Sequence, residues 1–72
     1  MKKEIDTIAT GKFLGEAFSR AGMSHADIAS EFGVSLTTVY YWTAGKKMPS
    51  IKHLVNIASL LGCTLDEIIK VM

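Results

Sequence analysis

Residues 22–45 read GMSHADIASEFGVSLTTVYYWTAG, and we predict two short helices joined by a minimal turn within this stretch. Ser24 and Asp27 have the spacing of a capping box, in which each side chain bonds to the backbone of the other residue. A helix is therefore expected to begin directly after Ser24. Gly33 is expected to end it, because glycine readily adopts the left-handed backbone that closes many helices.

The next helix is predicted from Leu36 to Ala44. Ser35 offers a hydroxyl to its first free amides, and Gly45 follows its last residue. Val39 and Trp42 stand three positions apart and form its inward pair. Two short helices on so few connecting residues must cross steeply instead of packing side by side, which is helix-turn-helix geometry.

Three more helices are predicted around this pair, which makes the fold class all-α with five helices. The first is expected from Thr10 to Ala21, the fourth after a Ser50 cap as far as Gly62, and a short fifth after the Thr64 capping box to the chain end. The apolar residues expected on buried faces are Phe13, Leu14, Ala17, Phe18 and Ala21 in the first helix, Ile28, Ala29 and Phe32 in the second, Ile51, Leu54, Ile57, Ala58 and Leu61 in the fourth, and Leu65, Ile68, Ile69 and Met72 in the fifth.

The length of 72 residues allows one small domain, which we place at residues 10–72 behind an N-terminal extension of residues 1–9. Eight Lys and Arg residues against seven Asp and Glu give a net charge of +1, far from the basic balance of a non-specific nucleic-acid coat. A single cysteine, Cys63, excludes an internal disulfide. No apolar run is long enough for a membrane span, so we expect a cytoplasmic protein.

Enzymatic chemistry is not indicated by the titratable residues. The chain has no clustered pair of carboxylates, no nucleophile with an evident base, and no paired Cys and His spacing that would hold a metal ion. We therefore expect a non-enzymatic protein without cofactor, metal or small-molecule substrate, whose function lies on its surface.

Several short motifs stand at characteristic distances from one another. They are Gly22-Met23-Ser24, Asp27-Ile28-Ala29, Gly33-Val34-Ser35, Val39 with Trp42, Gly45, Pro49-Ser50, and Leu61-Gly62-Cys63-Thr64-Leu65-Asp66-Glu67. Together they resemble the Cro and lambda-type phage repressor family, also called the Xre family, over residues 10–69. The resemblance implies a compact five-helix domain, the lambda-repressor-like DNA-binding domain, whose third helix lies in the DNA major groove, with dimers reading two half-sites.

Carried over position by position, the resemblance also implies a set of contact residues. Leu36, Thr37, Tyr40 and Tyr41 would face the bases, with Ala44 near the far end of the helix and Ser35 at its start. Ser24, His25, Lys46, Lys47 and Lys52 would lie near phosphates, and Lys12 and Arg20 are weaker candidates.

Two departures from the family pattern affect this set. Arg or Lys usually reads guanine and Asn or Gln reads adenine, and the outward face of the third helix has none of these. Many members also pair an Arg of the first helix with a Glu that follows the Trp of the third. Here Phe18 and Thr43 stand at those positions, so both charges are absent together.

The predicted function is a helix-turn-helix transcriptional regulator of the phage lysis–lysogeny type that binds operator DNA, with a homodimer left open. As an alternative, the apolar and aromatic cluster of Leu36, Tyr40 and Tyr41 suits an antirepressor, which would bind the DNA-reading domain of a partner phage repressor. A third reading is an antitoxin-like dimerisation module that uses Ile69, Val71 and Met72.

Overall fold

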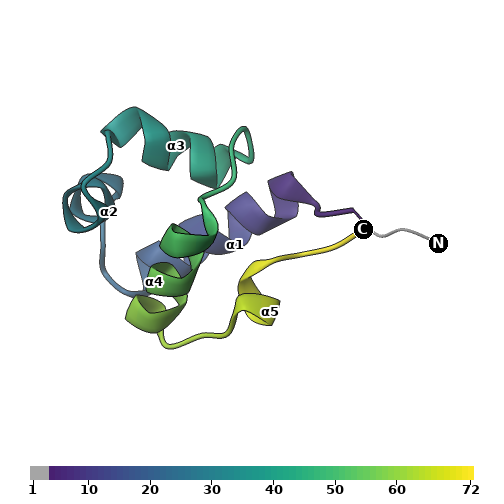
Figure 1. Ribbon diagram of the computed structural model, residues 1–72. Helices are drawn as coiled ribbons and strands as arrows, with labels where there is room; N and C mark the ends of the chain where they lie inside the picture. The colour runs from purple at the N-terminus through teal and green to yellow at the C-terminus, as the bar shows by residue number, and fades with distance from the viewer. Residues whose placement is uncertain (1–3) are drawn as a thin grey trace.

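The computed structural model describes residues 4–72, and Met1, Lys2 and Lys3 lie outside the described residues. Five helices follow one another: α1 (Thr7–Arg20), α2 (His25–Phe32), α3 (Leu36–Ala44), α4 (Ile51–Leu61) and α5 (Leu65–Ile68). Figure 1 shows α2 and the carboxyl end of the chain at opposite sides of the molecule, with α1 running between them. The predicted all-α, five-helix class is confirmed.

The second, third and fourth helices have the ends that their capping residues predict. Ser24, Ser35 and Ser50 each accept a hydrogen bond from the backbone N–H three positions on, and a glycine in the left-handed region follows each helix. Ser24 and Asp27 form the complete capping box at α2. These local contacts satisfy amides that a helix start leaves free.

The first helix lies against the end of α3 at the distance of backbone contact. A Cβ atom on Gly11 would lie 2.6 Å from the carbonyl oxygen of Trp42 and 2.7 Å from that of Thr43. A Cβ atom on Gly45 would lie 2.7 Å from the Cα of Ile8. Both positions thus require glycine, and the absence of their side chains is what allows α1 to hold α3 in place.

The core lies where α1, α2, α3 and α4 meet, with α5 closing it. Val39 and Trp42 are buried, which confirms the predicted inward pair of α3. Phe18 is 1% exposed, so it fills the interior at the position where the family often has a charge. The other members of this cluster are Leu14, Ile28, Ala29, Leu54, Ile57 and Ile68.

The first helix begins at Thr7, three residues before the predicted start at Thr10. The carboxylate of Asp6 accepts a hydrogen bond from the N–H of Ala9 at 3.0 Å, and this cap starts the helix earlier. The prediction that Ala21 and Ile51 lie on buried faces is wrong, since both are exposed. Division of the chain into residues 1–9 and 10–72 stays a prediction.

The chain does not stay helical to its end, and this part of the prediction is wrong. Helix α5 ends at Ile68, and the N–H of Lys70 donates to the hydroxyl of buried Thr10 at 2.9 Å. A contact with α1 therefore replaces the next helical hydrogen bond. Met72, which was expected on the buried face of α5, is 74% exposed.

Residues 4–6 and 70–72 form a short antiparallel pair, the terminal ribbon, with an isolated bridge between Ile5 and Val71. Two backbone hydrogen bonds hold it, from Asp6 N to Lys70 O at 2.8 Å and from Met72 N to Glu4 O at 3.0 Å. The ribbon joins the two ends of the described chain on the side away from α2 (Figure 1). Within residues 4–72, no helix is long and apolar enough to cross a membrane.

Candidate nucleic-acid interface

The turn between α2 and α3 fixes how the two helices cross. Gly33 has φ of +65°, and the N–H of Val34 returns to the carbonyl of Ala29 at 3.0 Å, so the chain reverses within three residues. Val39 of α3 then packs into the same core as Ile28 of α2. This packing leaves the opposite side of α3 to the solvent.

The outward face of α3 has the residues that the sequence places there. Leu36 is 46% exposed, Tyr40 53% and Tyr41 38%, which is high for large apolar and aromatic side chains. Thr37 and Ala44 are exposed beside them. We call Leu36, Thr37, Tyr40, Tyr41 and Ala44 the α3 face. It has apolar surface and hydroxyl groups, and none of its members is charged.

Two backbone amides at the start of α2 are already hydrogen-bonded to side chains, so they are not available to a phosphate. The Ser24 hydroxyl accepts from the N–H of Asp27 at 3.0 Å, and the Asp27 carboxylate accepts from the N–H of Ser24 at 2.9 Å. A fixed negative charge therefore already lies at this helix end, where it opposes a second anion. Ser35 is similarly engaged, since its hydroxyl contacts that of Thr38 at 2.8 Å.

His25, the first residue of α2, contacts α3. Its ring stacks on that of Tyr40 with centroids 4.3 Å apart and an interplanar angle of 14°. Its Nε2 atom lies 3.0 Å from Oγ1 of Thr43. His25 is half-buried as a result, and it joins the α3 face to the start of α2. No sequence pattern indicates this link, which depends on the crossing angle of the two helices.

The predicted cations gather near the end of α3. The Nζ atoms of Lys46 and Lys47 lie 5.9 and 5.8 Å from the centroid of the Tyr41 ring, within the range of a cation–π contact. Both residues are exposed, and both backbone N–H groups donate to the carbonyl of Tyr41. Lys52 is exposed in the first turn of α4. The positive charge thus borders the α3 face at one end.

His53 of α4 lies between the surface and the core. It is half-buried, its ring centroid lies 5.4 Å from that of Trp42 and 6.0 Å from that of Phe32, and its Nδ1 atom lies 2.9 Å from the Ser50 hydroxyl. These three rings connect α2, α3 and α4 beneath the interface. His53 therefore contributes to the support of α3.

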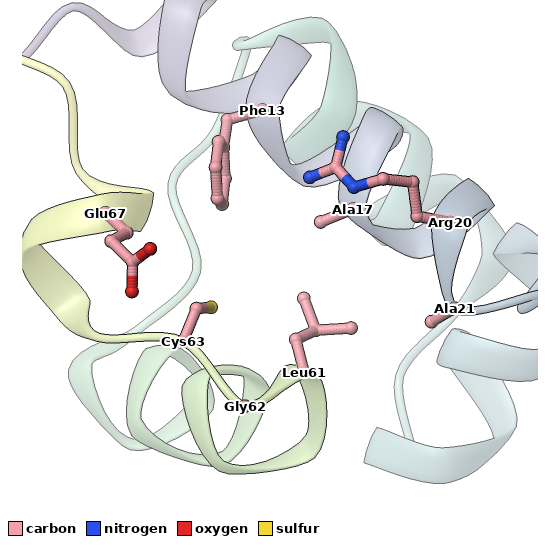
Figure 2. Close-up of a pocket in the computed structure, with 8 residues that line it drawn as sticks. All are labelled: Phe13, Ala17, Arg20, Ala21, Leu61, Gly62, Cys63 and Glu67. Atoms are coloured by element: carbon pink, nitrogen blue, oxygen red, sulfur yellow. The ribbon is translucent and has the colours of Figure 1, made fainter.

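A separate hollow of about 380 Å³ lies between α1 and the connection from α4 to α5. Figure 2 shows Arg20 and Glu67 on opposite walls, with Phe13, Leu61 and Cys63 between them. Burial raises the pKa of the Cys63 thiol, and the Glu67 carboxylate raises it further. No residue of α2 or α3 lines this hollow, so Arg20 lies apart from the α3 face.

Two further groups of sequence candidates can be placed. Thr43 stands at one of the two positions where many family members have a charge. Its side chain lies beside Gly15 of α1, and a Cβ atom added at Gly15 would lie 3.7 Å from the Thr43 side chain. Ile69 packs against the core, while Val71 and Met72 are exposed in the terminal ribbon. Among residues 4–72 no group of three or more His, Cys, Asp or Glu side chains could hold a metal ion.

A family model described as helix-turn-helix matches residues 18–68 of the chain. The chain is also 36% identical over 45 residues to the cryptic phage CTXphi transcriptional repressor RstR of Vibrio cholerae serotype O1. That alignment covers 62% of this chain and 40% of the relative, so the chain spans less than half of the relative's length.

Solved structures agree on the fold. The restriction-modification controller protein C.AhdI from Aeromonas hydrophila superposes with a TM-score of 0.76 at 22% identity, over 88% of this chain and 96% of that one. The iron(II) form of HppE gives 0.77 at 25% identity, over 88% of this chain and only 33% of HppE. The resemblance to HppE therefore concerns one part of that protein, and the likeness to C.AhdI extends over nearly its whole chain.

Proposed function

Because the chain belongs to the helix-turn-helix family, we propose that it is a transcriptional regulator of the phage lysis–lysogeny type whose α3 face binds operator DNA. The observation that carries the proposal is an exposed α3 face bordered by Lys46 and Lys47. A recognition helix needs an accessible outward face for the bases and nearby cations for the phosphates. The name of the phage repressor RstR supports the same assignment.

Base reading in this proposal relies on weak contacts. Leu36 packs on a thymine methyl group, and the hydroxyls of Thr37, Tyr40 and Tyr41 each donate or accept a hydrogen bond. Lys46, Lys47 and Lys52 supply affinity through phosphates, with Ser24, Ser35 and Ala44 at the margins of the contact. A homodimer on two half-sites would double these contacts. Catalysis has no part in this proposal.

The test is a titration of a duplex that carries the DNA upstream of the chain's own gene, at two salt concentrations. Replacing Lys46 and Lys47 by Ala should weaken binding to every sequence and lower the salt slope by about 0.9 for each lost phosphate contact. The matched control is the double variant Arg20→Ala and Lys70→Ala, which removes the same charge around the hollow that Phe13 lines. Equal affinity of the parent and the Lys46 and Lys47 variant would refute the interface.

A second candidate function is favoured by the composition of the α3 face. Leu36, Tyr40 and Tyr41 are large, exposed and uncharged, and such a cluster is typical of a surface that binds protein. The chain would then act as an antirepressor that covers the DNA-reading domain of a partner phage repressor. In that case the base-reading side chains of the partner would supply the charged or amide groups that are absent from the α3 face.

The two functions differ in how binding responds to salt and to loss of an aromatic ring. In a complex with the DNA-reading domain of a partner phage repressor, Tyr41→Ala should cost about 2 kcal/mol or more, with little dependence on salt. Val55→Ala is the control, since Val55 is 49% exposed on α4. Tight binding of the duplex together with no association with the repressor domain would exclude the antirepressor function.

A further inference from the structure

The contact between His25 and Tyr40 lies within the proposed interface and has a specific geometry. The two rings are nearly parallel, at an interplanar angle of 14° and a centroid distance of 4.3 Å. Tyr40 remains 53% exposed, while His25 is half-buried. One face of an otherwise exposed tyrosine ring is thus covered by a residue from the neighbouring helix.

His25 is itself held by Thr43. The hydroxyl of Thr43 lies 3.3 Å from the carbonyl oxygen of Tyr40, to which it donates, and 3.0 Å from Nε2 of His25. The Thr43 hydroxyl thus links the imidazole of His25 to the backbone of Tyr40. The Thr43 side chain also packs against Gly15 of α1. The imidazole is therefore tied to the rigid part of the fold.

We propose that His25 is a positioning residue that holds the Tyr40 ring in the orientation it has in the complex. The proposal rests on the proposed function, since it takes the α3 face as the binding surface. An exposed tyrosine must lose rotational freedom when it binds, and a ring that is already stacked has less to lose. His25 acts through Tyr40, and it need not contact the ligand.

This role replaces the direct phosphate contact that the sequence suggests for His25. Nε2 already contacts the Thr43 hydroxyl and one face of the ring is stacked on Tyr40, so less of the imidazole is free for a phosphate. Asp27 and Ser24 already occupy the amides beside it. The surroundings of His25 thus favour orientation of Tyr40 over anion binding.

The first arm of the test uses the free protein and nitrogen-15 NMR of the His25 ring. We expect one tautomer to dominate, because the Thr43 hydroxyl contacts Nε2. Thr43→Val keeps the shape of the side chain and removes the hydroxyl, so the preference for this tautomer should weaken. A parent protein in which neither tautomer dominates, or Tyr40 ring signals that do not change in His25→Ala, would overturn the proposal.

The second arm is a double-mutant cycle on binding of the upstream duplex. His25→Ala should weaken binding about threefold or more, and it should have little further effect once Tyr40 is Ala, because the two residues act as a unit. His25→Phe should restore most of the affinity, since a phenyl ring can stack on Tyr40. Thermal melting of each variant verifies that it is folded.

The outcomes of this cycle distinguish failure of the positioning role of His25 from failure of the proposed function. If the parent binds and the effects of His25→Ala and Tyr40→Ala multiply independently, the positioning role is refuted and the proposed function stands. If His25→Phe binds as weakly as His25→Ala, the role is likewise refuted. If the parent does not bind the duplex, the proposed function fails and the positioning role fails with it.

Discussion

Gly11 offers the sharpest test of how the fold holds the third helix in place. A Cβ atom at this position would lie 2.6 Å from the carbonyl oxygen of Trp42, 2.7 Å from that of Thr43 and 2.8 Å from the backbone nitrogen of Gly45. All three atoms belong to the backbone at the end of α3, so no side chain can rotate away. Gly11→Ala therefore forces α1 and α3 apart.

The size of the effect follows from these distances. Comfortable contacts between heavy atoms lie at about 3.5 Å, so α3 must move by roughly 0.8 Å to accept the methyl group. Overpacking of this kind costs about 1–3 kcal/mol, and three simultaneous backbone clashes place it at the upper end. Alanine recovers about 1 kcal/mol through its higher helix propensity. We expect a net loss of about 2 kcal/mol, which for a domain of this size lowers Tm by about 8–16 °C.

Thermal unfolding followed by circular dichroism measures this loss, and Gly15→Ala is the matched control. Gly15 lies one turn further along α1, where an added Cβ would meet the Thr43 side chain at an ordinary 3.7 Å. That variant should melt at or slightly above the temperature of the parent because only the gain in helix propensity remains. A Gly11→Ala protein as stable as Gly15→Ala would show that α1 and α3 are not in backbone contact.

The remaining predictions concern the core, the chain end and the thiol. Trp42→Ala should cost about 3–5 kcal/mol, and a variant that melts within a few degrees of the parent would contradict the inward orientation of α3. Thr10→Val should cost about 1–3 kcal/mol in urea unfolding, because the N–H of Lys70 loses its acceptor while the shape of the side chain is kept. Iodoacetamide should alkylate Cys63 more slowly at neutral pH than a free cysteine does, since its raised pKa leaves less thiolate. Glu67→Gln should move the pH profile of that reaction to lower pH, and an unchanged profile would exclude the carboxylate as a cause.

Local signals account for the parts of the fold that the sequence predicts well. Ser35 and Gly45 delimit α3 because capping acts within a few residues of the helix end, where a sequence pattern can display it. The end of α5 could not be found in this way. It depends on the hydrogen bond between Lys70 and Thr10, which joins residues 60 positions apart.

In the candidate site, too, local patterns predict some features, while others depend on contacts between residues far apart in the sequence. Exposure of Leu36 and Tyr40 follows from the helical period once Val39 and Trp42 face inward. The link from His25 to Thr43 spans 18 positions and depends on how α2 crosses α3, which no periodic pattern encodes. For the α3 face, the sequence therefore predicts which residues reach the surface, and the structure adds which of them touch each other.

The terminal ribbon determines how the molecule responds to a pulling force. Its two segments lie side by side and antiparallel, so handles attached at residues 4 and 72 would separate them from one end, one hydrogen bond after another. Bonds that break in succession yield at lower force than bonds that shear together. Once the ribbon opens, tension passes to the Asp6 cap and the first turn of α1, which lies against Gly45 at the end of α3. Mechanical unfolding would thus begin at the chain ends and reach the α3 face through the glycine contact between the two helices.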